Sequence, residues 1–427
     1  MVLVLFLGGL AVLILAGVPV SFALLGSALL MMWWLDVLDP QILADAMYNG
    51  ADSYPLMAIP FFILAGELMV AGGLTTRIVS LMTSMLGHIR GGLGYAAIVA
   101  SVIMASLSGS AVADTAAIGS VLLPMMRNAG YDVPRSAGLI GTGGIIAPII
   151  PPSIAFIVFG ITANVSILDL FFAGIAPGLM MGITLMAIWA VLVRSDVTKV
   201  YPWAGWKAIR ESLFSGFWAL LMPLIIIGGL KAAIFTPTEA SATAVAYALF
   251  VGAVVYRELT VEKFLKACRE AAFTSASVMF LVATASASAW LVTTSQVPLV
   301  LAGFLEPIIG SPRILVLVIV ILVLIVGCVM DFTPNVLILT PVLMPVVRMA
   351  GIDPVYFGVV FILANCVGLL TPPVGVVLNV ICGIGKIPMG VGAKGALPFI
   401  LGMAFLLALF IAIPDLILVP FRWIVRL

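Results

Sequence analysis

VLLPMMRNAGYD, residues Val121 to Asp132, returns 221 positions later as VLMPVVRMAGID, residues Val342 to Asp353, with seven of the 12 positions identical. The same shift, without a gap, places Pro151-Pro152 on Pro372-Pro373. In membrane carriers, interrupted apolar segments at matching places in two halves are the strongest sequence indication of a binding site. The repeat therefore predicts a chain of two related halves, each with a polar turn and a proline-broken segment.

The composition is that of a protein embedded in a membrane. The 427 residues are 64% hydrophobic and 9% charged, with a mean hydropathy of +1.32, whereas about a quarter of the residues of a soluble domain are charged. A net charge of +1 provides no basic face for nucleic acid. One histidine, His88, and four cysteines in mostly apolar stretches argue against a histidine-based metal centre, a Ser-His-Asp triad or a disulfide framework.

The pattern of apolar segments predicts an all-α polytopic membrane protein. Each half is expected to hold a re-entrant helical hairpin followed by a proline-broken span, because the pieces beside each polar turn are too short to cross a bilayer. The hairpins are expected at Tyr95–Met126, turning at 107–110, and at Ile314–Ala350, turning at 327–335; the broken spans are expected at Pro134–Val165 and Pro354–Gly385.

Unbroken apolar segments and polar connections make up the remainder. Full spans are expected at Val2–Gly17, Val18–Leu35, Pro55–Gly72, Gly174–Val193, Phe214–Leu230, Ala240–Tyr256, Phe273–Thr293 and Ala396–Ile413. Interfacial arms are expected at Leu74–Arg90 and Val297–Pro307, an interfacial linker at Arg194–Ser212, and a charged loop at Arg257–Glu270. With the N-terminus outside, inner loops hold 14 of the 19 Lys and Arg residues, so the positive-inside rule favours that orientation and inverts the two repeats.

The hairpin tips and the breaks that face them are expected to bind a cation and a solute. Small residues and free backbone groups admit close approach, and oxygen ligands suit sodium rather than a soft metal. Candidate sodium ligands are Ser106, Ser108, Gly109, Asp114, Thr142, Gly143 and Gly144 in the first half, and Gly327, Asp331, Thr333, Asn365, Gly368 and Thr371 in the second. Candidate substrate contacts are Ser108, Gly109, Ser110, Pro151, Pro152, Ser153, Thr333, Asn335, Pro372 and Pro373.

Structural explanations remain open for several of these residues. Small residues around Gly143 and at the tips also suit close helix packing. Asp331 is the stronger carboxylate candidate because it lies in the tip itself, whereas Asp114 could cap a helix. Glu67 is a further candidate, and Glu239 fits a helix start equally well. Arg127 and Arg348 are interpreted as charges at helix C-termini, because Ala-Gly follows each after one residue.

The motifs together resemble the large membrane subunit of tripartite ATP-independent periplasmic (TRAP) transporters, the DctM-like group. They are the paired LLPMMRNAGYD and LMPVVRMAGID, IPFFILAGELM, GGLKAAIFTPTEA, IIPPS and LLTPPVG, and they cover nearly the whole chain. The resemblance implies a sodium-coupled elevator in a bacterial inner membrane, with a periplasmic N-terminus. The transport domain would comprise residues 93–166 and 311–388. The scaffold helices, with the arms and the linker, would comprise residues 1–92 and 167–310, and a C-terminal helix and tail would follow at residues 389–427.

The resemblance also implies the substrate class and the partners. A soluble periplasmic binding protein would deliver a carboxylate such as sialic acid or a dicarboxylate, and a separate, small four-helix membrane subunit would assemble with this chain. The related stand-alone carriers have Ser-Asn-Thr at both tips, where this chain has Ser108-Gly109-Ser110 and Thr333-Pro334-Asn335. A stand-alone sodium- or proton-coupled dicarboxylate carrier is the alternative. An intramembrane enzyme is disfavoured because Asp114 and Asp331 lie in separate halves, and a passive channel is disfavoured by the inverted repeats.

Overall fold

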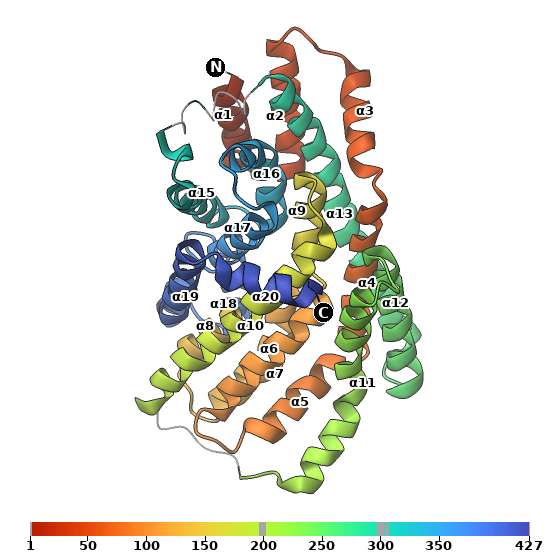
Figure 1. Cartoon of the computed structure of the whole chain (residues 1–427). Helices are drawn as coiled ribbons and strands as arrows, with labels where there is room; N and C mark the ends of the chain where they lie inside the picture. The colour runs from red at the N-terminus through yellow and green to blue at the C-terminus, as the bar shows by residue number, and fades with distance from the viewer. Residues whose placement is uncertain (1, 196–201, 297–302, 304–306, 427) are drawn as a thin grey trace.

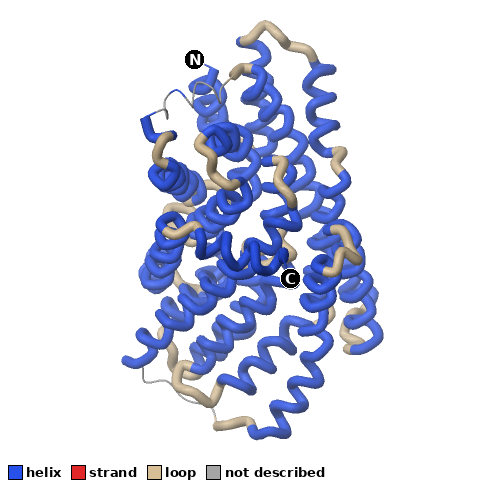
Figure 2. Tube along the Cα trace, viewed as in Figure 1, coloured by secondary structure: helices blue, strands red, loops and turns tan. Residues whose placement is uncertain are grey.

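The computed structural model describes residues 2–195, 202–296, 303 and 307–426. These residues form helices joined by short connections and contain no β-strand (Figure 2). Seven helices within the described ranges are long and apolar enough to cross a membrane. The prediction of an all-α polytopic fold is confirmed.

The helices of the first half precede a long central connection. They are α1 (Val2–Leu15), α2 (Val20–Trp34), α3 (Pro40–Ala51), the 3-10 turn η1 (Tyr54–Met57), α4 (Ala58–Ala71), α5 (Leu74–Leu86), α6 (Gly92–Ser108), α7 (Ala111–Asn128), α8 (Val133–Gly144), α9 (Ile154–Ala163), α10 (Ile167–Leu192) and the 3-10 turn η2 (Val193–Ser195). The hairpin α6–α7 and the broken helix α8–α9 match the prediction, although α8 ends slightly earlier than expected.

The helices of the second half follow the same order. They are α11 (Gly205–Lys231), α12 (Pro237–Phe250), the π-helical turn η3 (Val251–Val255), α13 (Val261–Thr294), α15 (Pro312–Gly327), α16 (Phe332–Met349), α17 (Pro354–Gly368), α18 (Val376–Gly385), α19 (Met389–Ala412) and α20 (Asp415–Arg426). A shift of 221 carries the bounds of α7 onto those of α16, and a shift of 222 carries α9 onto α18. The stretch from the paired prolines to the second helix piece is thus one residue longer in the second half than in the first.

The two halves interlock through their hairpins and broken helices. The second helix of the first hairpin, α7, packs on α18, while its counterpart α16 packs on α9. Each hairpin therefore contacts the broken helix of the other half as well as that of its own half. Figure 1 shows this interlocked group beside a rod of α3, α4 and α13, with α12 packed on α4 and α11 packed on α5.

Three expectations about the connections need correction. The charged stretch Arg257–Glu270 is mostly helical, because the Thr260 hydroxyl accepts the Lys263 N–H at 3.3 Å and starts α13. The segment before Pro55 contains α3, which was not expected and which Asp39 caps. The second hairpin turns at residues 328–331 only: α16 begins at Phe332, since Pro334 lies in a first turn whose amides need no intrahelical acceptor.

Two further expectations concern interfacial segments. The linker expected at Arg194–Ser212 falls partly outside the described residues, and its later part is the first turns of α11, which continues without a break to Lys231. The arm expected at Val297–Pro307 lies almost wholly outside the described residues. The first arm is present as α5, which ends before Arg90.

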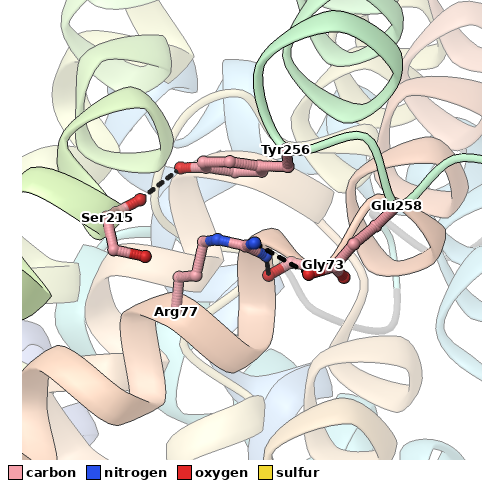
Figure 3. A network of polar contacts seen from close by, with 5 residues as sticks. All are labelled: Gly73, Arg77, Ser215, Tyr256 and Glu258. Carbon is pink, nitrogen blue, oxygen red and sulfur yellow. Dashed lines mark hydrogen bonds and ion pairs between the residues drawn. The ribbon is translucent and has the colours of Figure 1, made fainter.

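A polar network fastens α5 to the second half of the chain (Figure 3). Arg77 pairs with Glu258 at 2.7 Å, donates to the Gly73 carbonyl at 3.0 Å, and lies 3.7 Å above the Tyr256 ring. Burial raises the pKa of Tyr256 and the Arg77 charge opposes this rise, while the phenol donates to the Ser215 carbonyl at 2.6 Å. The network joins α5, α11 and the connection before α13.

We expect the Arg77–Glu258 pair to contribute a measurable coupling energy. A double-mutant cycle with Arg77→Ala and Glu258→Ala should give about 1 kcal/mol in the free energy of unfolding in detergent, because the pair is half-buried and stacked on an aromatic ring. The exposed pair Arg269–Glu270 is the control, and its cycle should give less than about 0.5 kcal/mol. Equal coupling in the two cycles would contradict the assignment.

Candidate functional site

The first hairpin tip is a tight turn against the first break. Helix α6 ends at Ser108, Gly109 adopts φ +63°, and the Ser110 hydroxyl accepts the Ala113 N–H at 3.4 Å to start α7. A Cβ at Gly109 would lie 2.7 Å from the Pro152 carbonyl oxygen. Both the backbone conformation and the contact therefore require glycine, and the tip residues meet the break as predicted.

Asp114 is a buried carboxylate with an unused oxygen. Asp114 follows the tip and is only 1% exposed. Its Oδ1 accepts a hydrogen bond from the Ser108 hydroxyl, and its Oδ2 has no hydrogen-bond partner among the described residues. Ser110, rather than Asp114, caps α7, so the capping role considered for Asp114 is wrong. A carboxylate buried in this way is costly unless a cation or a proton neutralises it.

The end of α8 approaches the hairpin through two glycines. A Cβ at Gly144 would overlap the Thr115 hydroxyl, and one at Gly143 would lie 2.5 Å from the Ser101 hydroxyl. The oxygens of Ser101 and Thr115 are buried and without partners among the described residues. Because the two glycines let α8 approach the hairpin closely, these unpaired oxygens lie beside the α8 backbone. The same glycines can therefore serve both helix packing and the binding of an ion.

Sequence reasoning missed Ser101 and Thr115 as candidate ligands. Ser101 precedes Ser108 by two helical turns on α6, and Thr115 follows Asp114 on α7. The seven-residue spacing to Ser108 is a signal that predicts a shared helix face. Their proximity to Gly143 and Gly144, however, depends on how α8 crosses the hairpin.

The second tip also lies on its own break. The Cys328 carbonyl accepts the N–H groups of Val374 and Gly375 at 3.2 and 3.5 Å, and the backbones of Gly327 and Gly368 are in contact. The Asn335 amide donates to the Asn365 side-chain oxygen, and its own Oδ1 is buried without a partner among the described residues. The tip and the break of the second half thus come together as those of the first half do.

A large cavity lies away from both tips. It has a volume of about 880 Å³ and is bounded by α3, α9, α13 and α16. Its lining includes Asn164, Trp290 and Arg348. None of the candidate sodium or substrate residues at the tips and breaks lines it.

A match to a protein-family model identifies the family of this chain. The family described as "Tripartite ATP-independent periplasmic transporter, DctM component" matches residues 7–416. The chain belongs to the DctM family. Its relatives include the large permease protein of the 2,3-diketo-L-gulonate TRAP transporter of Escherichia coli, which is 54% identical over 98% of this chain and 97% of that protein.

A second relative supports the same assignment, and a solved structure shows a related fold. The sialic acid TRAP transporter large permease protein of Vibrio cholerae is 38% identical, with 94% of each chain covered. The crystal structure of the YdaH transporter of Alcanivorax borkumensis matches with a TM-score of 0.63 at 15% identity, covering 89% of this chain and 91% of that one. The latter likeness shows that the folds are related.

The two candidate sites of this DctM-family chain differ in exposure. Pro151, Pro152 and Ser153 of the first break are buried, whereas Pro372 and Pro373 of the second are exposed. The first tip is covered by α4, since a Cβ at Gly66 would lie 3.5 Å from the Ser108 Cα. The first site is therefore enclosed and the second open.

Several predicted side chains use their hydroxyls or carboxylates within their own helix. The hydroxyls of Ser106, Thr142 and Thr371 donate to the preceding-turn carbonyls of Ile103, Gly138 and Val367. Their oxygens keep lone pairs for a cation. Asp331 is exposed and accepts the Phe332 N–H at 2.8 Å as the N-cap of α16, and Thr333 lies in the first turn of that helix.

Of the remaining charged candidates, Glu239, Arg127 and Arg348 have structural partners. Glu239 forms a capping box with Thr236 at the start of α12, which confirms the helix-start interpretation. Glu67 interacts electrostatically with Lys266 and Glu270 of α13. Arg127 and Arg348 lie in the last turns of α7 and α16, as interpreted, and each reaches a backbone carbonyl in the other half.

Proposed function

We propose that this DctM-family chain is the large permease subunit of a sodium-driven importer of a sugar acid, located in a bacterial inner membrane with a periplasmic N-terminus. A soluble periplasmic binding protein delivers the substrate, and a small four-helix membrane subunit completes the complex. The substrate class is supported by the 54% identity to a 2,3-diketo-L-gulonate permease. The outward N-terminus is supported by the distribution of Lys and Arg among the loops.

The observation that carries sodium coupling is the unpaired, buried Asp114. Its Oδ2 has no partner among the described residues, and unpaired oxygens of Ser101 and Thr115 lie near the same junction of α6, α7 and α8. Oxygen ligands suit a hard cation such as sodium. Each sodium ion that enters through 100 mV contributes about 2.3 kcal/mol, so coupling to sodium drives accumulation without ATP.

An elevator movement is the mechanism that we propose. The interlocked helices α6–α9 and α15–α18 would move together, because each hairpin packs on the broken helix of the other half. The rod of α3, α4 and α13, with α1, α2, α11 and α12, would remain fixed. Substrate would bind between the open second tip, near Thr333 and Asn335, and the break at Pro372-Pro373, while the enclosed first site holds sodium.

Proteoliposomes containing this chain and its small subunit test the function. We expect uptake of 2,3-diketo-L-gulonate that requires both an inward sodium gradient and the binding protein. Uptake of similar rate without the binding protein would instead support the stand-alone carrier. Uptake that is unchanged when potassium replaces sodium would overturn the proposed coupling.

A further inference from the structure

Two arginines related by the internal repeat make equivalent contacts. Arg127, in the last turn of α7, donates to the Gly385 carbonyl at the end of α18. Arg348, in the last turn of α16, donates to the Ala163 carbonyl at the end of α9 at 2.7 Å. Each guanidinium thus satisfies a free carbonyl at the C-terminus of the other half's broken helix. This structural role is common to both residues.

Arg348 differs from Arg127 because it also lines the cavity of about 880 Å³ between α3, α9, α13 and α16. Figure 1 shows these helices towards the end of the molecule that bears the N-terminus. Arg348 is the only charged residue among the described residues that line the cavity. Polar groups on the walls are supplied by Asn49, Ser53, Thr162, Asn164, Ser286 and Thr293.

The chemistry of this lining selects an anion. A guanidinium has five N–H donors, and its recorded acceptors, Ala163 and Asn164, are both reached from Nη2. Nε and Nη1 have no acceptor among the described residues, so they are available to a ligand. No acidic side chain lines the described part of the cavity to neutralise the charge, and a guanidinium matches a carboxylate in a bidentate manner.

We propose that this cavity is a vestibule that holds a polyhydroxylated carboxylate, with the carboxylate on Arg348 and the hydroxyls against the Ser, Thr and Asn side chains. The volume lies within the 300–1,000 Å³ range typical of small-molecule sites. The proposal rests on the proposed function, because it assigns the sugar acid a holding site between the fixed rod and the moving helices. A substrate released by the binding protein reaches this cavity before the hairpin tips.

The electrostatic part of the proposal can be measured without any transport. Thr162 lines the cavity beside Ala163, so Thr162→Cys is introduced after Cys268, Cys328, Cys366 and Cys382 have been replaced by alanine or serine. The anionic and cationic methanethiosulfonate reagents are then compared. We expect the anionic reagent to react about fivefold faster relative to its rate with a free thiol, owing to the unneutralised guanidinium.

Three variants separate the charge of Arg348 from its contact with α9. Arg348→Gln should abolish the preference for the anionic reagent, Arg348→Lys should retain it, and the matched control Arg127→Gln should leave it unchanged. Equal reactivity of the two reagents in the parent protein would overturn the vestibule. Loss of the preference in Arg348→Lys as well as in Arg348→Gln would also overturn it, because only the helix contact would then matter.

Uptake measurements separate failure of the vestibule from failure of the proposed function. With 2,3-diketo-L-gulonate as the probe, Arg348→Gln should raise KM about tenfold or more while kcat changes by less than about twofold, the result of losing a charged ligand contact. Arg127→Gln should leave KM unchanged. An unchanged KM in Arg348→Gln overturns the vestibule alone, whereas absence of sodium-driven uptake in the parent protein overturns the proposed function.

Discussion

Asp114→Asn is expected to abolish sodium-dependent uptake. The substitution keeps the shape of the side chain and removes the negative charge that, in our proposal, compensates a sodium ion at the first site. Asp114 is 1% exposed, and only one of its two oxygens has a partner among the described residues. We expect the sodium concentration for half-maximal uptake to rise at least about tenfold, or uptake to fall to background, because a charged ligand to a buried cation contributes several kcal/mol.

The control for this prediction is another aspartate in the same half. Asp132 is exposed and caps α8 by accepting the Arg135 N–H at 2.8 Å. Asn caps helices as well as Asp does, so Asp132→Asn should leave both sodium dependence and stability within measurement error. If Asp114→Asn kept the sodium dependence of the parent protein, the first tip would not be the coupling site. Isothermal calorimetry with NaCl on the purified complex gives an independent measurement.

Gly109→Ala is expected to lower both uptake and stability, although it adds only one methyl group. The left-handed conformation at this position costs about 1–2 kcal/mol for a residue with a Cβ. The new Cβ would also lie 2.7 Å from the Pro152 carbonyl oxygen, and relieving such overlap typically costs about 1–3 kcal/mol more. The tip would have to move away from the first break, so uptake should fall at least about tenfold and the melting temperature should decrease.

Gly351 provides a matched control for the cost of the left-handed backbone conformation. It has φ +67° at the end of α16, and a Cβ there would meet no atom within 4 Å. Gly351→Ala therefore includes the conformational cost without the overlap. We expect it to lower the melting temperature slightly and to leave KM and sodium dependence unchanged. Similar uptake defects in the two variants would show that the contact between the first tip and the first break has no special role.

The interlocked repeats explain why the tips and breaks are sensitive to small changes. Hairpin helix α7 packs on α18, and α16 packs on α9. A shift of either hairpin tip therefore displaces the broken helix of the other half as well as that of its own half. The equivalent arginine contacts to Gly385 and Ala163 connect the same pairs of helices. This arrangement favours movement of the two halves as one body, which the proposed elevator requires.

The helical class, the repeat and the positions of the two breaks could all be predicted from the amino-acid sequence alone. Apolar segments of spanning length have one stable form in a bilayer, because each backbone amide must find an acceptor within its own segment. Pro151-Pro152 and Pro372-Pro373 interrupt that pattern locally, so the breaks are visible without any tertiary information. The cap at Glu239 and the last-turn positions of Arg127 and Arg348 were likewise predictable, since helix ends are specified by residues within one or two turns.

Which polar groups are buried, paired or exposed depends on how distant segments pack, and the sequence does not show this. Its position in a tip makes Asp331 the stronger ligand candidate in the sequence. In the structure Asp331 is exposed and caps α16, whereas Asp114 is buried and one of its oxygens has no partner among the described residues. Ser101 and Thr115 become candidates only because α8 crosses the first hairpin at Gly143 and Gly144. Arg348 and the equivalent Arg127 have similar neighbours in the sequence, but only Arg348 lines the cavity. Burial and cavities arise from contacts between distant segments, and no local pattern encodes these contacts.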